Sequence, residues 1–315
     1  MKKIASVILT ISIILTAGIF ALPANAADKV YYPELEGIGM FAMGDSYFGG
    51  STLGKSVTWV NKLGEKYNMN YSNEGIGGST MSDYVTTNNP MSTRIRKYKK
   101  IDADIVLLEG GRNDRSKLVP LGDVDSRDTK TFRGAINFMI DFVLEKNPEA
   151  LIILVTVWKH SNTNSLGYSN ITYADAMRDV AEYRNDPRVI CLYAADAELT
   201  SVDMDDPRFR VKYCTKPDDV SHLNEKGMDL VLPNMEKFIA EAYINYLSYL
   251  NPPETTVEET TAVETTAPAV TAETTAAPET EPAQESGCRG FVSFSALPLI
   301  ILGAYAVIRK KKNSY

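Results

Sequence analysis

The sequence predicts an α/β fold, a three-layer α/β/α sandwich around a parallel sheet of about five strands. Nearly continuous apolar stretches occur at residues 103–108, 151–157 and 188–193. This pattern is typical of strands that are buried on both faces of a parallel sheet. Stretches of helical character at 132–146 and 174–184 separate the three strands. Alternation of buried strands with helices favours a sheet covered by helices on both faces.

The remaining elements fit the same fold. Residues 39–45 form an apolar strand that leads into a Gly-rich turn, and residues 69–72 form a second, short strand. Between them, residues 56–67 have apolar residues at helical spacing. A last helix is expected at 225–250, where Pro233 favours a kink. In open sheets of this kind the ligand site lies beyond the carboxyl ends of the strands.

The two ends of the chain differ from this globular middle, residues 27–250. Residues 1–26 have the charged start, apolar middle and small-residue exit of a secretory signal peptide. An uncleaved membrane helix is the alternative. Residues 251–287 are rich in Thr, Glu, Pro and Ala, without an aromatic residue, and predict a disordered linker.

An apolar segment at 291–308 is followed by the basic tail 309–315. This pattern predicts a C-terminal transmembrane anchor with a cytoplasmic tail, so the membrane is an expected partner. A sorting signal that is cut and re-attached to the wall is an alternative, but no Leu-Pro-x-Thr-Gly sequence is present. These interpretations place the middle of the chain outside the cell, at the extracellular face of the cell membrane or at the cell surface.

Composition limits the classes of partner. The net charge is −7 and no dense basic stripe is present, so nucleic acid is not an expected partner. The chain has two His and no Cys-x-x-Cys spacing, and we expect neither a metal nor a cofactor. Cys191 and Cys214 could pair in a disulfide outside the cell, although a buried Cys191 in a strand is the favoured interpretation.

Reactive or positioning residue types gather in four loops. Three loops follow predicted strands and the fourth lies near the end of the globular part. Each sequence alone is a weak signal, since Gly-Asp-Ser is also an ordinary turn or helix cap. The four sequences are Gly44-Asp45-Ser46, Asn73-Glu74-Gly75-Ile76-Gly77-Gly78, Gly111-Arg112-Asn113-Asp114 and Asp219-Val220-Ser221-His222.

These loops contain the parts of an activated nucleophile. A serine hydroxyl needs a neighbouring base, and histidine suits this task near neutral pH. His222 lies three residues after Asp219, a spacing that lets the carboxylate hold one imidazole nitrogen while the other faces a serine. Asp218 is the alternative orienting residue. His160 has no carboxylate near it in sequence, which favours a polar loop residue, and together with Trp158 and Lys159 it could line a substrate cleft.

In this order the four loops resemble the four blocks of the SGNH hydrolases, also called GDSL esterases, over residues 40–227. The resemblance implies a flavodoxin-like SGNH hydrolase fold with Ser46 as nucleophile. The Asp-x-x-His pattern of that family selects Asp219 over Asp218. The expected oxyanion donors are the backbone N–H of Ser46, the backbone N–H of Gly78 and the side-chain amide of Asn113.

Family members place their glycine five residues after the asparagine of the second block, here Asn73, which selects Gly78 over Gly75 and Gly77. The serine does not lie in the Gly-x-Ser-x-Gly elbow of α/β-hydrolases. This difference favours an open site without a lid.

The sequence says less about the substrate than about the type of reaction. The longest loops, 115–129 and 159–172, are rich in Ser, Asn, Asp and Thr, with Trp158 and Tyr168 at hand. Such loops favour a polar, sugar-bearing ester, small or polymeric, and the hypothesis is removal of acetyl or another small acyl group from carbohydrate. A lysophospholipase or broad acyl-esterase is the alternative within the same fold. A non-catalytic surface-binding module is the alternative from another class.

Overall fold

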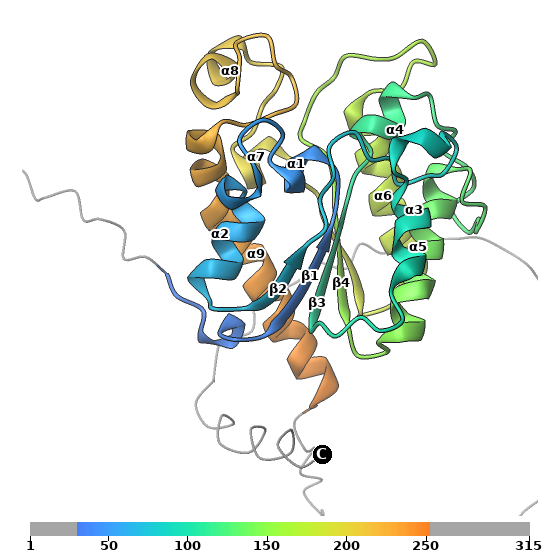
Figure 1. Cartoon of the computed structure of the whole chain (residues 1–315), viewed down its shortest axis with the longest axis vertical. Coiled ribbons are helices and arrows are strands. Elements are labelled where there is room, and N and C mark those ends of the chain that lie inside the picture. The colour runs from blue at the N-terminus through green and yellow to red at the C-terminus, as the bar shows by residue number, and fades with distance from the viewer. Residues whose placement is uncertain (1–29, 253–315) are drawn as a thin grey trace, which may run out of the picture. The chain divides into compact units, whose positions relative to one another are not determined.

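A computed structural model of the chain describes residues 30–252, which all belong to one compact unit (Figure 1). The predicted signal peptide 1–26, nearly all of the linker 251–287, the predicted anchor 291–308 and the tail 309–315 lie outside the described residues. Among residues 30–252, no helix combines the length and the apolar character that crossing a membrane requires.

Five parallel strands form one sheet in the order β2-β1-β3-β4-β5, which is the flavodoxin-like order. This sheet confirms the predicted fold class. The strand bounds differ from the expected ones by one or two residues at most ends. The strands are β1 (Gly39–Met43), β2 (Asn70–Asn73), β3 (Ile105–Glu109), β4 (Leu151–Val155) and β5 (Val189–Leu192).

Helices cover both faces of the sheet (Figure 1). One face carries α2 (Trp59–Lys66) and α9 (Glu225–Leu250), which contact each other. The other face carries α5 (Phe132–Lys146) and α6 (Asn170–Arg184), which also contact each other. Shorter helices occupy the connections, namely α1 (Ser46–Gly49), α3 (Met91–Arg94), α4 (Arg112–Ser116), α7 (Ala197–Thr200), α8 (Pro207–Tyr213) and the 3-10 turns Pro33–Leu35, Lys55–Val57, Thr86–Asn88 and Ile95–Lys97.

Alternation along the central strands divides the buried apolar side chains between two clusters, because successive residues of a strand point to opposite faces. Met40 and Leu107 belong to the cluster under α2 and α9, whereas Phe41 and Leu108 belong to the cluster under α5 and α6. The sheet is therefore buried on both sides, as the continuous apolar stretches predicted.

Local capping sets two helix starts that periodicity alone misplaced. The Oγ1 of Thr58 accepts the N–H of Asn61, so α2 begins at Trp59 and the preceding residues form a 3-10 turn. Ser169 and Thr172 form a capping box, so α6 begins at Asn170 instead of near 174.

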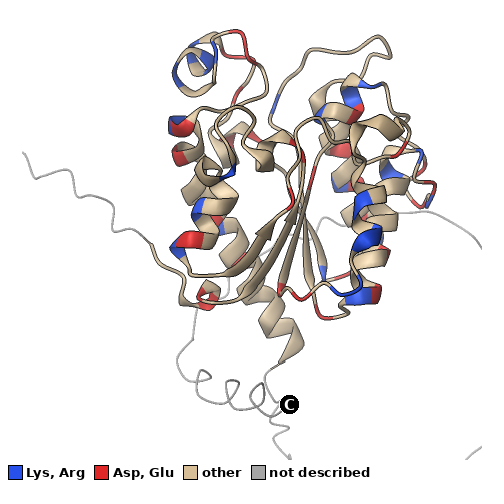
Figure 2. Cartoon of the chain, viewed as in Figure 1, with Lys and Arg blue, Asp and Glu red and all other residues tan. Residues whose placement is uncertain are grey.

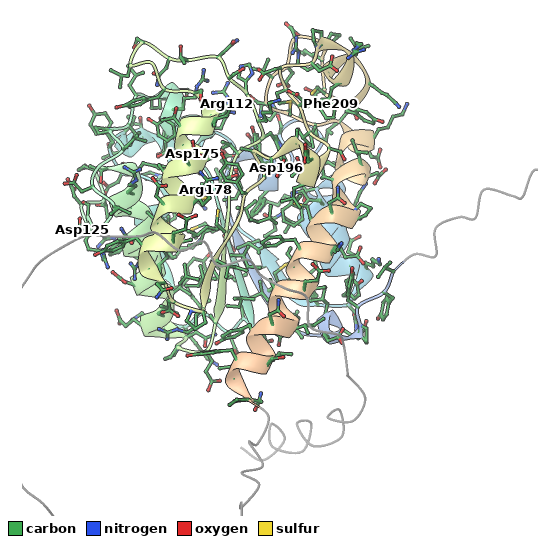
Figure 3. The ribbon with its side chains drawn as sticks, turned by 180° about the vertical axis from the view of Figure 1, so that it is seen from behind. Arg112, Asp125, Asp175, Arg178, Asp196 and Phe209 are labelled. Carbon is green, nitrogen blue, oxygen red and sulfur yellow. The ribbon has the colours of Figure 1, made fainter. Side chains whose placement is uncertain are left out.

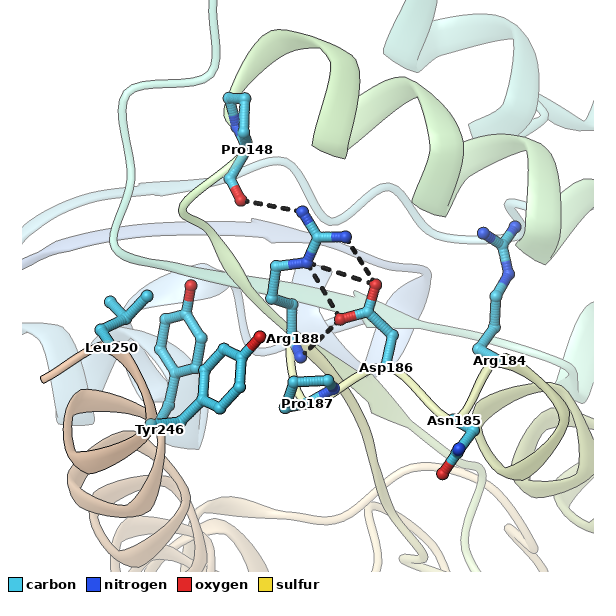
Figure 4. A pocket seen from close by; sticks show the side chains of 9 residues that line it. Pro148, Arg184, Asn185, Asp186, Pro187, Arg188, Tyr246 and Leu250 are labelled. Atoms are coloured by element: carbon cyan, nitrogen blue, oxygen red, sulfur yellow. Dashed lines mark hydrogen bonds and ion pairs between the residues drawn. The ribbon is translucent and has the colours of Figure 1, made fainter. Parts of the chain in front are cut away.

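Charges of both signs are spread over the helices and loops (Figure 2). The cysteines within the described part, Cys191 and Cys214, are both free, and Cys191 lies in β5 as the favoured interpretation expected. An open pocket lies beside the end of α9, near the amino ends of β4 and β5 (Figure 4). In this pocket the Arg188 guanidinium is already bound to Asp186 and to the carbonyl of Pro148. The four loops that contain the reactive residue types lie at the opposite, carboxyl ends of the strands.

Candidate active site

Ser46 is the first residue of α1, directly after the turn that ends β1. The Asp45 side chain caps α1 by accepting the N–H of Tyr47 at 2.9 Å. The Asp45 N–H donates to Oε2 of Glu109 at 2.9 Å. A Cβ on Gly44 would lie 2.7 Å from that same oxygen, so the turn requires glycine there. Strand β1 therefore delivers Ser46 to the carboxyl edge of the sheet in a fixed orientation.

Ser46, His222 and Asp219 form one hydrogen-bonded chain. The Oγ of Ser46 lies 2.9 Å from Nε2 of His222. The Nδ1 of His222 lies 3.1 Å from Oδ2 of Asp219. Since a carboxylate accepts and does not donate, the proton belongs on Nδ1, which leaves Nε2 to accept the serine hydroxyl. The structure thus brings together the three residues that the sequence analysis selected.

Four donors hold the Asp219 carboxylate. Its Oδ1 accepts the N–H groups of Ser221 and His222, each at 2.9 Å, and its Oδ2 accepts the Thr215 hydroxyl as well as the His222 ring. Burial acts to raise the pKa of Asp219, but the hydrogen bonds from Thr215, His222 and Ser221 outweigh it and hold the pKa below its usual value. Asp219 is therefore ionised at neutral pH and fixed in position.

Aromatic rings support the imidazole from behind. The Tyr47 ring meets the His222 ring edge-on at 6.4 Å and stacks on Trp158 at 5.4 Å. Trp158 is only 1 % exposed, so the expectation that it could line a substrate cleft was wrong. The His222 side chain keeps 30 % exposure, which leaves the reactive pair open to solvent.

The loop after β2 lies against the nucleophile turn, where a Cβ on Gly77 would be 3.9 Å from the Cβ of Ser46. A Cβ on Gly75 would lie 2.4 Å from the backbone nitrogen of Gly49, so close packing explains this glycine. Gly78 has φ +79°, and a Cβ added to it would have no atom within 4 Å, so its backbone conformation and not close packing favours glycine there. Within residues 30–252, the backbone N–H groups of Ser46 and Gly78 have no acceptor. Both groups are therefore free to donate to a substrate oxygen.

The Asn113 amide already has two acceptors. Its Nδ2 donates to Oδ2 of Asp45 at 2.8 Å and to the carbonyl of Ser79 at 2.9 Å. An oxyanion held by this amide would share or replace one of these hydrogen bonds. Asn113 thus also ties the nucleophile turn to the loop after β2, a contact that the sequence did not indicate.

Three buried carboxyl groups lie beneath the site. Burial raises the pKa of Glu109 well above its usual range, and the charge of Asp45 raises it further. Asp45 accepts two N–H groups, whereas Glu109 accepts only one. We therefore take Asp45 as the ionised member of the pair and Glu109 as the protonated one. Burial also raises the pKa of Asp114 to about 7, although the N–H groups of Met81 and Ser82 donate to it.

Sequence analysis missed several contributors. Glu109 could have been noticed as a single acid at the end of an apolar strand, but nothing in the sequence links Thr215 to Asp219. His160 is buried, at 4 % exposure, and its Nδ1 lies 2.9 Å from Oδ1 of Asp205. His160 therefore lies in the loop after β4, as expected, but the fold buries it and gives it a carboxylate partner 45 positions away, which its sequence neighbourhood does not reveal. Asp218 takes no part in holding His222, whose Nδ1 faces Asp219.

A serine, a histidine and an aspartate linked in this order define a serine hydrolase site, here at the carboxyl edge of a flavodoxin-like sheet. Residues 42–230 match the model of the GDSL-like lipase/acylhydrolase family, which covers more than half of the chain. The chain belongs to that family and is a carboxylic ester hydrolase, so the alternative of a non-catalytic binding module is discarded.

Two solved structures with TM-scores above 0.5 show the same fold. One crystal structure has a TM-score of 0.57 at 25% sequence identity and covers 66% of this chain and 98% of its own. A protein from Lactobacillus plantarum has a TM-score of 0.55 at 22% identity and covers 65% of this chain and 98% of its own. A possible lipase from Chitinophaga pinensis has a TM-score of 0.49 at 20% identity, with coverages of 65% and 98%. No curated protein sequence matches the chain.

Proposed function

We propose that the chain is a cell-surface esterase that removes acetyl or other small acyl groups from carbohydrate through a Ser46 acyl-enzyme. The observation that carries the proposal is the continuous Ser46–His222–Asp219 chain. His222 takes the proton of Ser46 as the hydroxyl attacks the ester carbonyl, and then gives it to the departing alcohol. In the second step His222 activates water, which releases the acid and restores Ser46.

The negative charge that develops on the ester oxygen needs donors in place. The free N–H groups of Ser46 and Gly78 supply two, and Asn113 supplies the third when it exchanges or shares its bond to the carbonyl of Ser79. Asp219 remains ionised and stabilises the imidazolium that forms on His222. All of these steps use residues of the chain itself.

Polar loops support a carbohydrate substrate. The described loops 117–131 and 159–169 are largely polar and carry exposed Lys117 and Ser161, which suit hydroxyl-rich ligands. Buried Tyr47 and Trp158 fill the space behind the imidazole and limit the site on that side. Cell-surface localisation rests on the sequence at the two ends of the chain, the signal-like residues 1–26 and the apolar segment 291–308.

One observation favours the alternative, a lysophospholipase or broad acyl-esterase. Leu53 and Ile76, from the two loops beside Ser46, are 39 % and 38 % exposed. Apolar side chains at a site entrance can accommodate a longer acyl chain.

Hydrolysis of p-nitrophenyl acetate, compared with p-nitrophenyl esters of longer acids, distinguishes the two functions. The small-acyl proposal predicts a preference for acetate, release of acetate from acetylated polysaccharide and loss of both activities in Ser46→Ala. Preference for long chains with hydrolysis of lysophospholipid would support the alternative. Ester hydrolysis that survives in Ser46→Ala would overturn both.

A further inference from the structure

Arg112 lies beside the proposed catalytic residues, as the first residue of α4 after β3. Its Nε donates to the Oγ of Ser221 at 2.8 Å, and Ser221 directly precedes His222. Figure 3 shows Arg112 at the end of the molecule where the loops after the strands gather. The residue is half-buried, and its hydrogen bond to Ser221 places it next to His222.

Arg112 and its neighbour Arg115 have no carboxylate partner. Among residues 30–252, neither guanidinium lies within ion-pair distance of an Asp or Glu. The Arg115 nitrogens donate to the backbone carbonyls of Tyr168 and Asn162. Arg112 donates only through Nε, to a neutral hydroxyl, which leaves both of its Nη groups without an acceptor in the described part of the chain.

The other charged groups on this side already have partners. Lys159 pairs with Asp203 at 2.8 Å. Asp205 accepts the Ser161 hydroxyl and faces His160. Within residues 30–252, Arg112 is therefore a half-buried cation next to His222 that has no direct ion pair and two Nη groups without an acceptor, although its charge also acts on the buried Asp45.

Two neighbouring guanidinium groups favour a bound anion. Burial lowers the pKa of Arg115, and the charge of Arg112 lowers it further. Burial likewise lowers the pKa of His160, and both arginines add to the effect. His160 is therefore neutral near pH 7 and adds no charge of its own. An anion between the guanidinium groups and the solvent would relieve their mutual repulsion.

We propose that Arg112 binds an anionic group on the substrate, so that the preferred substrate is an acyl ester of an acidic sugar. The two free Nη groups form a planar fork that matches a carboxylate, sulfate or phosphate. The anion lies on the alcohol part of the ester, because an acetyl group carries no charge. This inference rests on the proposed function and specifies its substrate.

The test compares one O-acetylated uronic acid with its methyl ester, which differ by a single charge near the scissile bond. We expect wild-type kcat/KM to favour the free acid by about 10- to 100-fold, the discrimination that a charge-assisted hydrogen-bonded pair supplies. Arg112→Gln should reduce this ratio to about one, and added salt should reduce it in the wild type. An O-acetylated sugar phosphate and sugar sulfate, each against the neutral sugar, show which anion fits best.

Two further variants separate recognition of charge from support of the loop. Arg208→Gln removes an exposed arginine far along the chain and should leave the ratio unchanged. Ser221→Ala removes the hydroxyl bound to Arg112 but keeps the charge, so it should keep the preference for anionic esters. Loss of the preference in Ser221→Ala as well as in Arg112→Gln would mean that Arg112 acts only by supporting the loop, and would overturn the inference.

The two proposals fail in different ways. If anionic and neutral esters are hydrolysed equally by the wild type while Ser46→Ala is inactive, the anion site is wrong and the esterase mechanism stands. If Ser46→Ala remains active on every ester, the mechanism itself is wrong. A ratio above one that is the same in the wild type and in Arg112→Gln would also overturn the inference.

Discussion

The buried acid Glu109 provides a quantitative test of the interior of the site. Its side chain is 1 % exposed, and burial together with the Asp45 charge keeps it protonated in the folded protein. In the unfolded chain it ionises near its ordinary pKa of about 4.3. Above that pH the folded state holds one proton that the unfolded state has lost. Stability therefore falls as pH rises toward the raised pKa, by up to about 1.4 kcal/mol per pH unit.

Glu109→Gln removes this loss, because the amide is neutral in both states and its oxygen can still accept the Asp45 N–H. Urea unfolding between about pH 5 and pH 8 measures the effect. The stability of Glu109→Gln relative to wild type should increase with pH at up to about 1.4 kcal/mol per unit. Asp114, whose pKa is about 7, contributes to both proteins, so the difference between them reports on Glu109 together with Asp45, to whose charge it responds.

Stability curves that stay parallel over this range would refute the assignment of the proton to Glu109. Glu109→Ala is the contrasting variant, since it leaves the buried Asp45 N–H without an acceptor. That loss should cost about 1–3 kcal/mol at every pH, before any cost of the cavity.

Three further variants test the geometry of the site, two by steady-state kinetics on an acetyl ester and one by urea unfolding. Asp219→Asn should lower kcat by about 10⁴ with little change in KM, because an amide favours the wrong imidazole tautomer; an effect below tenfold would contradict the role of Asp219. Asn113→Ala should lower kcat by about 10²–10³, and unchanged turnover would remove Asn113 from the oxyanion site. Gly78→Ala should destabilise the fold by about 1–2 kcal/mol in urea, since its φ of +79° is unfavourable for residues with a Cβ, and equal stability would show that the loop relaxes.

The sequence predicted the layers and the reactive residues well, for physical reasons. Strands buried on both faces must be apolar throughout, so β3 and β4 were visible as continuous stretches. His222 and Asp219 lie three positions apart, so their contact is local and could be read from spacing. The selection of Gly78 and Asn113 depended on resemblance to the family, because nothing in their sequence spacing links them to Ser46.

Contacts between distant segments could not be predicted. Glu109 reaches Asp45 only after β1 and β3 have paired, and Asp205 reaches His160 only after β4 has paired with β5 and the chain beyond β5 has returned to the loop after β4. Trp158 was expected near the substrate because it follows a strand, but its ring stacks on Tyr47 and is buried there. Helix starts were misplaced where a cap, such as Ser169, overrode the apolar pattern.

Covalent capture of the nucleophile tests the central claim most directly. The purified chain is treated with a fluorophosphonate ester, a reagent that stops at the covalent serine adduct, and its intact mass and peptides are measured. The account predicts one adduct, on Ser46, that is absent from Ser46→Ala and forms much more slowly in His222→Ala, in parallel with the loss of esterase activity. An adduct on another residue, or full inactivation without modification of Ser46, would contradict it.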